Sequence, residues 1–146
     1  MSTEAMIDRL RELLRGEVSA VDTYELALRW TRDPALRRVL WELQGEHDER
    51  VRLLRSKLHE LAAEPGDGSG GWGAFAELVQ ASADLLGDTT AVSALLEGEE
   101  HGLRLYQKAV DEGEPVVRDL VRTVLLPAQL RTVELCRTLK QHVIAA

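Results

Sequence analysis

The pentapeptide Leu-Leu-Arg-Gly-Glu at residues 13–17 recurs as Leu-Leu-Glu-Gly-Glu at residues 95–99, 82 positions further along the chain. Tyr24 recurs as Tyr106 at the same offset, so both copies carry a glutamate and a tyrosine seven residues apart. Single matches of this kind arise easily by chance, but several matches in the same order indicate an internal repeat. The chain is therefore predicted to contain two similar halves.

Each half has the hydrophobic spacing of a helical hairpin. Apolar residues recur every three or four positions, which places them on one side of a helix. The pairs Asp33-Pro34 and Glu114-Pro115 mark the start of a second helix in each half, because proline fits the first helical turn. These pairs are 81 positions apart, which allows one residue of slippage in a loop, and the offset returns to 82 at Val51 and Val133. Pro127 is expected to kink the last helix.

The composition favours a single all-α domain over residues 1–146. Hydrophobic residues make up 45% of the chain, whereas aromatic residues, which favour strands, make up only 4%. We expect an antiparallel four-helix bundle of two hairpins, at about residues 3–63 and 88–146, related by a pseudo-twofold axis. A Gly-rich crossover over residues 64–87 is expected to join the hairpins and to contain an extra short helix.

Charge and hydropathy limit the classes of partner. A net charge of -7 argues against nucleic acid, because phosphate binding depends on clustered lysine and arginine. No apolar run is long enough to cross a membrane, and the first ten residues lack the apolar core of a signal peptide. A cytoplasmic protein is therefore expected. Trp30, Trp41 and Trp72 are interpreted as packing or interface residues, and a homodimer is the expected assembly.

Two carboxylates fall on the core-facing sides of the predicted helices. Glu17 lies in the first helix and Glu99 in the third, and Tyr24 and Tyr106 lie two turns further along the same faces. A buried carboxylate needs a compensating charge, which either a metal ion or cations from the other two helices can supply. On the second helix, the candidates at the core-facing side are Glu46, His47 and Arg50. The repeat offset aligns His47 with Gln129 and Arg50 with Thr132 on the fourth helix.

Several stretches are similar to those of short bacterial proteins of unknown function in the ferritin-like superfamily, which includes ferritins, bacterioferritins and rubrerythrins. These stretches are RGEVSAVDTYELAL, GWGAFAELVQ, LLGD and EGEEHGLRLY. The resemblance implies a bundle in which the first and third helices each give a glutamate and the other two each give Glu-x-x-His to two metal ions. Glu17 and Glu99 match the two single glutamates.

The chain departs from the superfamily pattern at the other ligands. The two Glu-x-x-His positions fall on His47 and Arg50 and on Gln129 and Thr132, and the chain contains no Glu-x-x-His. The resemblance therefore implies the superfamily fold, but it does not carry over a complete pair of metal sites.

Two hypotheses about the core follow. In one, Glu17, His47 and Glu99, completed by Glu46, Gln129 or water, bind iron, manganese or zinc in an oxidoreductase or iron-handling protein. In the other, which we favour, Arg50 and protonated His47 neutralise the carboxylates, Tyr24 and Tyr106 donate hydrogen bonds to them, and the protein is structural or binding rather than catalytic. The position of Arg50 separates the hypotheses, because its charge would repel a metal cation.

Overall fold

The computed structural model describes residues 3–66 and 87–145, and these residues form helices and short loops without a β-strand. The prediction of an all-α protein is confirmed for this part of the chain. Most of the expected crossover, including its extra short helix and Trp72, lies outside the described residues. None of the described helices is long and apolar enough to cross a membrane.

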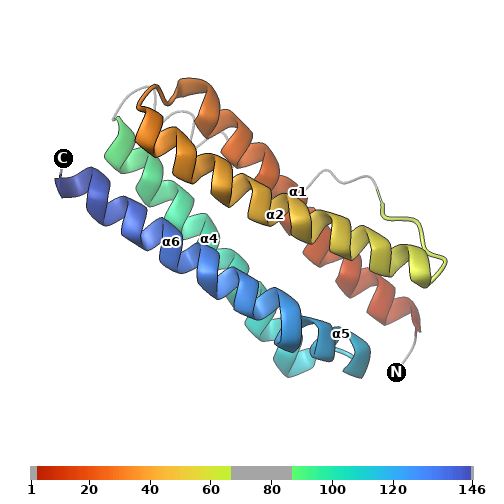
Figure 1. The fold of residues 1–146 in the computed structure, drawn as a ribbon. Helices are drawn as coiled ribbons and strands as arrows, with labels where there is room; N and C mark the ends of the chain where they lie inside the picture. The colour runs from red at the N-terminus through yellow and green to blue at the C-terminus, as the bar shows by residue number, and fades with distance from the viewer. Residues whose placement is uncertain (1–2, 67–86, 146) are drawn as a thin grey trace.

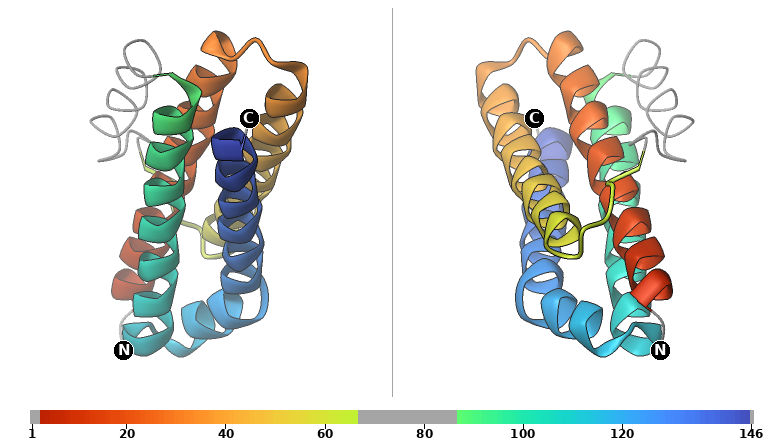
Figure 2. Two further views of the ribbon diagram at one scale, coloured as in Figure 1. Left: turned by 90° about the vertical axis from the view of Figure 1, so that its left-hand side faces the viewer. Right: turned by 90° about the vertical axis from the view of Figure 1, so that its right-hand side faces the viewer.

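The described helices form a bundle of two hairpins (Figure 1). In the first hairpin, α1 (Thr3–Trp30) packs antiparallel to α2 (Pro34–Glu60). In the second, α4 (Asp88–Glu112) packs antiparallel to α6 (Leu126–Ala145). α6 continues from α5 (Pro115–Leu120) and a π-helical segment η1 (Val121–Leu125), and α5 lies at an angle to α6 (Figure 2). Because α2 ends at one end of the bundle and α4 begins at the other, α2 and α4 run parallel (Figures 1 and 2).

The starts of the second helices follow the predicted proline signals. Pro34 and Pro115 occupy the first turns of α2 and α5, where their missing N–H groups leave no hydrogen bond unmade. The Asp33 side chain accepts a hydrogen bond from the Ala35 amide at 3.0 Å and caps α2. Arg37 donates to the carbonyl oxygens of Leu28 and, at 2.9 Å, Thr31, which satisfies backbone groups at the end of α1.

The π-helical segment explains how the repeat keeps its register. The loop between α4 and α5 is one residue shorter than the loop between α1 and α2, so the offset falls from 82 to 81 at the prolines. A π turn takes one more residue than an α turn, as the hydrogen bond from the Leu126 amide to the Val121 carbonyl shows. The offset is therefore 82 again at Val133, whose counterpart is Val51. The turn ends just before Pro127, whose ring would clash with the carbonyl of Thr123 in a regular α-helix.

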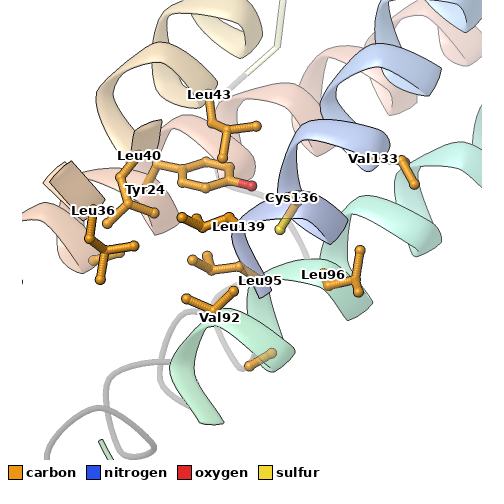
Figure 3. Packing of buried hydrophobic residues seen from close by; sticks show 12 residues of the cluster. Tyr24, Leu36, Leu40, Leu43, Val92, Leu95, Leu96, Val133, Cys136 and Leu139 are labelled. Atoms are coloured by element: carbon orange, nitrogen blue, oxygen red, sulfur yellow. The ribbon is translucent and has the colours of Figure 1, made fainter. Parts of the chain in front are cut away.

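Two apolar clusters fill the bundle on either side of a polar centre. One cluster joins side chains near the start of α2 and the end of α6, including Leu36, Leu40 and Cys136, to Tyr24 and Val92 (Figure 3). The other cluster lies towards the opposite end, and its fully buried members are Leu10, Leu54, Leu58, Val117, Val121 and Leu125. Burial of these side chains stabilises the fold and excludes water from the polar centre between them.

Candidate functional site

Four ionisable side chains meet in the middle of the bundle. Glu17 comes from α1, His47 and Arg50 come from α2, and Glu99 comes from α4. Each is at most 5% exposed, so each has lost almost all contact with solvent. Buried charges require partners, and their hydrogen bonds therefore decide what this centre can do.

The His47 ring joins the two carboxylates. Its Nδ1 lies 2.6 Å from Glu17 Oε2, and its Nε2 lies 2.6 Å from Glu99 Oε2. A carboxylate oxygen is only an acceptor when ionised, so these two short contacts favour the imidazolium form of His47, in which both ring nitrogens donate. Neither nitrogen then keeps a lone pair for a metal ion. Arg50 Nη1 also lies 3.3 Å from His47 Nδ1, a longer contact than that of Nδ1 with Glu17.

The pKa values follow from these contacts. Burial by itself lowers the pKa of His47, but the charges of Glu99 and Glu17 and the hydrogen bonds to them outweigh it and raise this pKa to about 9. Burial by itself raises the pKa of each glutamate, but the His47 cation outweighs it. The pKa of Glu99 is lowered to about 2, and the pKa of Glu17 is also lowered. At neutral pH the site therefore contains two carboxylates and an imidazolium.

The two repeated tyrosines bind the glutamate of the opposite half. Tyr24 Oη donates to Glu99 Oε2 at 2.7 Å, and Tyr106 Oη donates to Glu17 Oε1 at 2.6 Å. The Tyr24 ring also stacks on the His47 ring, with 5.6 Å between centroids. Burial and the neighbouring carboxylates raise both tyrosine pKa values well above 10, so both hydroxyl groups remain donors.

Arg50 reaches across the bundle to α6. Its guanidinium group donates to Gln129 Oε1, to the Ala128 carbonyl oxygen at 2.8 Å and to Thr132 Oγ1 at 3.0 Å. Its Nη1 also lies 3.5 Å from Glu17 Oε1. With Arg50 and His47 as cations and Glu17 and Glu99 as anions, the formal charges of the centre cancel.

Gln129 connects Arg50 to Glu99. Its Nε2 donates to the Glu99 carbonyl oxygen at 2.7 Å and to Glu99 Oε1 at 3.2 Å. Gly102, one turn beyond Glu99 on α4, makes room for this amide, because a Cβ atom at position 102 would lie 2.8 Å from Gln129 Nε2.

Of the five metal-ligand candidates, the structure brings together Glu17, His47, Glu99 and Gln129. Glu46 does not enter the centre, because its side chain is 37% exposed and its Oε2 lies 3.9 Å from Arg50 Nη2. Within residues 3–66 and 87–145, no group of three or more histidine, cysteine, aspartate or glutamate side chains is arranged to hold a metal ion.

Sequence reasoning missed two parts of this centre. The Ala128 carbonyl that accepts from Arg50 leaves no side-chain signal in the sequence. Gly102 does leave one, because a glycine inside a predicted helix suggests a close approach by another group.

A small cavity adjoins the network between α1 and α4. Its volume is about 30 Å³, and its described lining includes Gly16, Ala20, Gly102 and the network residues Glu17 and Glu99. A cavity of this size holds about one or two water molecules, whereas sites for organic ligands have volumes of roughly 300–1,000 Å³.

Comparison with known protein families identifies the family of this chain. A family model described as "Domain of unknown function (DUF2383)" matches residues 5–112, which include nearly all of α1 and all of α2 and α4. Comparisons with curated proteins and with solved structures gave no match.

Proposed function

This chain belongs to the DUF2383 family of domains of unknown function, and we propose that it is a ferritin-like bundle with a metal-independent core. In this proposal the protein has a structural or binding role and is not a metal-dependent oxidase. The proposal rests mainly on the position of Arg50, which lies where the superfamily pattern has a metal-binding histidine.

Three features support the ferritin-like assignment. The two hairpins are joined so that α2 and α4 are parallel. Glu17 and Glu99 occupy equivalent positions on α1 and α4 and both point into the centre. The exchanged hydrogen bonds of Tyr24 and Tyr106 are what a pseudo-twofold axis through the bundle would produce.

Charge balance supports a core without metal. Two carboxylates are matched by two protein cations, and a divalent ion in the same centre would raise its formal charge to +2. To use His47 as a ligand, the ion would have to displace a proton from a ring nitrogen that contacts Glu17 or Glu99, and the formal charge of the centre would still be +1. As arranged, these residues do not fit the dinuclear site that the resemblance implies.

The size of the adjoining cavity supports a role away from the core. At about 30 Å³ it has no room for an organic substrate beside Glu17 or Glu99. The network then acts as a polar clamp that fixes how the two hairpins pack, and binding takes place on the outer surface. The hydrogen bonds of this network join α1, α2, α4 and α6 and so favour one packing arrangement of the hairpins, although Arg50 Nε has no hydrogen-bond partner within the described residues.

Metal content tests the proposal. The protein is incubated anaerobically with ferrous iron, manganese or zinc, desalted, and analysed for bound metal by mass spectrometry. We expect the wild type to retain no more metal than a Glu17→Ala/Glu99→Ala variant. Near-stoichiometric metal in the wild type that is lost in this variant would contradict the proposal and support the oxidoreductase or iron-handling alternative.

A rebuilt variant provides the positive control. The substitutions His47→Glu, Arg50→His, Gln129→Glu and Thr132→His restore Glu-x-x-His on α2 and α6 at the superfamily positions. If the bundle is ferritin-like, this variant should gain metal binding and be stabilised by it, with a melting temperature that a chelator lowers. The melting temperature of the wild type should not change with the chelator.

A further inference from the structure

The outer face of α2 carries a row of residues at regular spacing, all of them exposed except the half-buried Asp48. Successive members are separated by three, four, three and four residues, which keeps them on the side of the helix opposite its buried leucines. We call this row the outer stripe; it consists of Arg38, Trp41, Gly45, Asp48 and Arg52. Among the described helices, α1 and α6 pack against α2. Neither view of Figure 2 shows another described helix over the outer face of α2.

Trp41 is the most conspicuous member of the stripe. Its exposed fraction is 72%, the highest among the large hydrophobic residues that the structure describes. It also borders a surface hollow that includes Pro34 and Arg38 among its lining residues. An isolated tryptophan contributes little to the fold from such a position, whereas buried tryptophans contribute strongly to protein interfaces.

Gly45 is the second unexplained feature, and it lies one turn from Trp41. Glycine in the middle of an exposed helix costs about 1 kcal/mol relative to alanine. Nothing lies within 4 Å of the position that a Cβ atom would take at residue 45, so the folded chain does not require glycine there. This contrasts with Gly102, where Gln129 fills the space. A missing side chain on an open face allows another group to approach the helix backbone closely.

We propose that the outer stripe is a homodimer interface, in which α2 packs antiparallel against α2 of a second copy. In the proposed register, Trp41 of each copy packs over Gly45 of the other. Arg38 precedes Trp41 by three residues and Asp48 follows Gly45 by three residues, so this register also places Arg38 opposite Asp48 of the second copy. Such an interface is isologous, because each copy contributes the same surface.

Charge complementarity favours a second copy in this orientation as the occupant. Within the described residues Arg38 forms no ion pair, so its charge is available to a partner, and Asp48, whose side chain is 41% exposed, pairs only with Arg52 on its own helix. Antiparallel packing brings Arg38 and Asp48 together twice in each dimer. Parallel packing in register would instead place Arg38 against Arg38 and Asp48 against Asp48, which is repulsive.

The dimer is tested by sedimentation velocity of the full chain over a concentration series. We expect a reversible monomer–dimer equilibrium whose dissociation constant rises at least tenfold for Trp41→Ala and for Gly45→Leu. Leucine favours the helix more than glycine does, so Gly45→Leu should raise the melting temperature while it weakens the dimer. Leu130→Ala is the matched control, because Leu130 is 50% exposed on α6 and lies off the stripe.

A charge exchange tests the register. Arg38→Asp and Asp48→Arg should each weaken the dimer severalfold, and the double variant should restore it, because opposite charges again face each other. A wild type that is monomeric at every concentration, or a dimer that Trp41→Ala and Gly45→Leu do not weaken, would overturn the proposal. Failure of the double variant to restore the dimer would overturn the antiparallel register. These results concern the surface of α2 and are independent of the metal content of the core.

Discussion

The two hairpins share one design on their first helices and differ on their second helices. α1 and α4 supply equivalent residues, a glutamate and a tyrosine each, and each tyrosine donates to the glutamate of the other half. α2 supplies both cations, His47 and Arg50, whereas the equivalent positions on α6 hold the neutral Gln129 and Thr132. The equivalence of the two halves is therefore kept for the anions and lost for the cations.

This difference shows how a repeat can diverge without leaving a charge unpaired. Had α6 also carried a histidine and an arginine, four cations would face two carboxylates. With neutral residues on α6, Gln129 and Thr132 instead accept hydrogen bonds from Arg50. The second hairpin thus supplies acceptors for both terminal nitrogens of the Arg50 guanidinium group, whereas Arg50 Nε has no hydrogen-bond partner within the described residues. Neither half contains a complete polar network by itself.

Removing a cation from α2 should have the largest effect. Arg50→Met leaves two buried carboxylates facing only His47, so we expect a loss of about 3–5 kcal/mol in the free energy of unfolding, measured in urea. Glu17→Ala should cost roughly 3 kcal/mol or more, because it leaves the buried cations of His47 and Arg50 facing only one carboxylate. The control is Arg52→Met, whose parent side chain is 69% exposed, and it should cost less than about 0.5 kcal/mol. Equal losses in the two arginine variants would show that Arg50 is not a buried partner.

The charge of His47 should make stability depend on pH. Its pKa in the folded state, about 9, lies above the usual 6.5, so its contribution is complete below pH 6.5 and is lost as the pH rises through 9. Glu99, whose pKa is lowered to about 2 from 4.5, contributes above pH 4.5 and loses this contribution as the pH falls through 2. Both contributions are therefore complete only between about pH 4.5 and 6.5.

Urea unfolding at a series of pH values measures this dependence. Between pH 6.5 and 10 the free energy of unfolding should fall by roughly 3 kcal/mol. A His47→Gln variant serves as control, because it should lose most of this decrease. A wild type that is equally stable at pH 6.5 and pH 10 would show that His47 is not a cation in the folded state.

The two tyrosines test the part of the arrangement that the halves share. Tyr24→Phe and Tyr106→Phe each remove one hydrogen bond to a buried carboxylate and keep the ring, so each should cost about 1–2 kcal/mol. If the pseudo-twofold arrangement holds, the two losses measured by urea unfolding should agree within roughly 0.5 kcal/mol. A large loss for one tyrosine and none for the other would mean that the halves are not equivalent at this level.

Two glycine substitutions should give the smallest effects, of opposite sign. Gly45→Ala adds a Cβ atom in open space and should stabilise the monomer by about 0.5–1 kcal/mol. Gly102→Ala forces the Gln129 amide away from Glu99, so it should destabilise by up to about 1 kcal/mol despite the better helix propensity of alanine. Thermal unfolding at low protein concentration measures both, and a gain in stability for Gly102→Ala would show that Gln129 moves away without cost.

The sequence alone was sufficient to predict the long helices of the two hairpins within the described residues, and it placed Glu17 and Glu99 on their core-facing sides. Helical periodicity and the proline signals are local properties, and the repeat offset aligned His47 with Gln129 and Arg50 with Thr132. The repeat could not show how the offset returns to 82 within the second hairpin. That required the structure, in which η1 takes up the extra residue as a π turn.

Only the tertiary structure decided which charged side chains of α2 face the centre. Glu46 and Arg50 are one turn apart at the border of the same face, and nothing in their local sequence separates them. Arg50 lies inward because acceptors on α6, about 80 residues away in the chain, bind the terminal nitrogens of its guanidinium group. Glu46 has no comparable donors in the centre and keeps its contact with solvent. A buried charge is retained only where its partners converge, and that convergence is a property of the packed helices and not of any one segment.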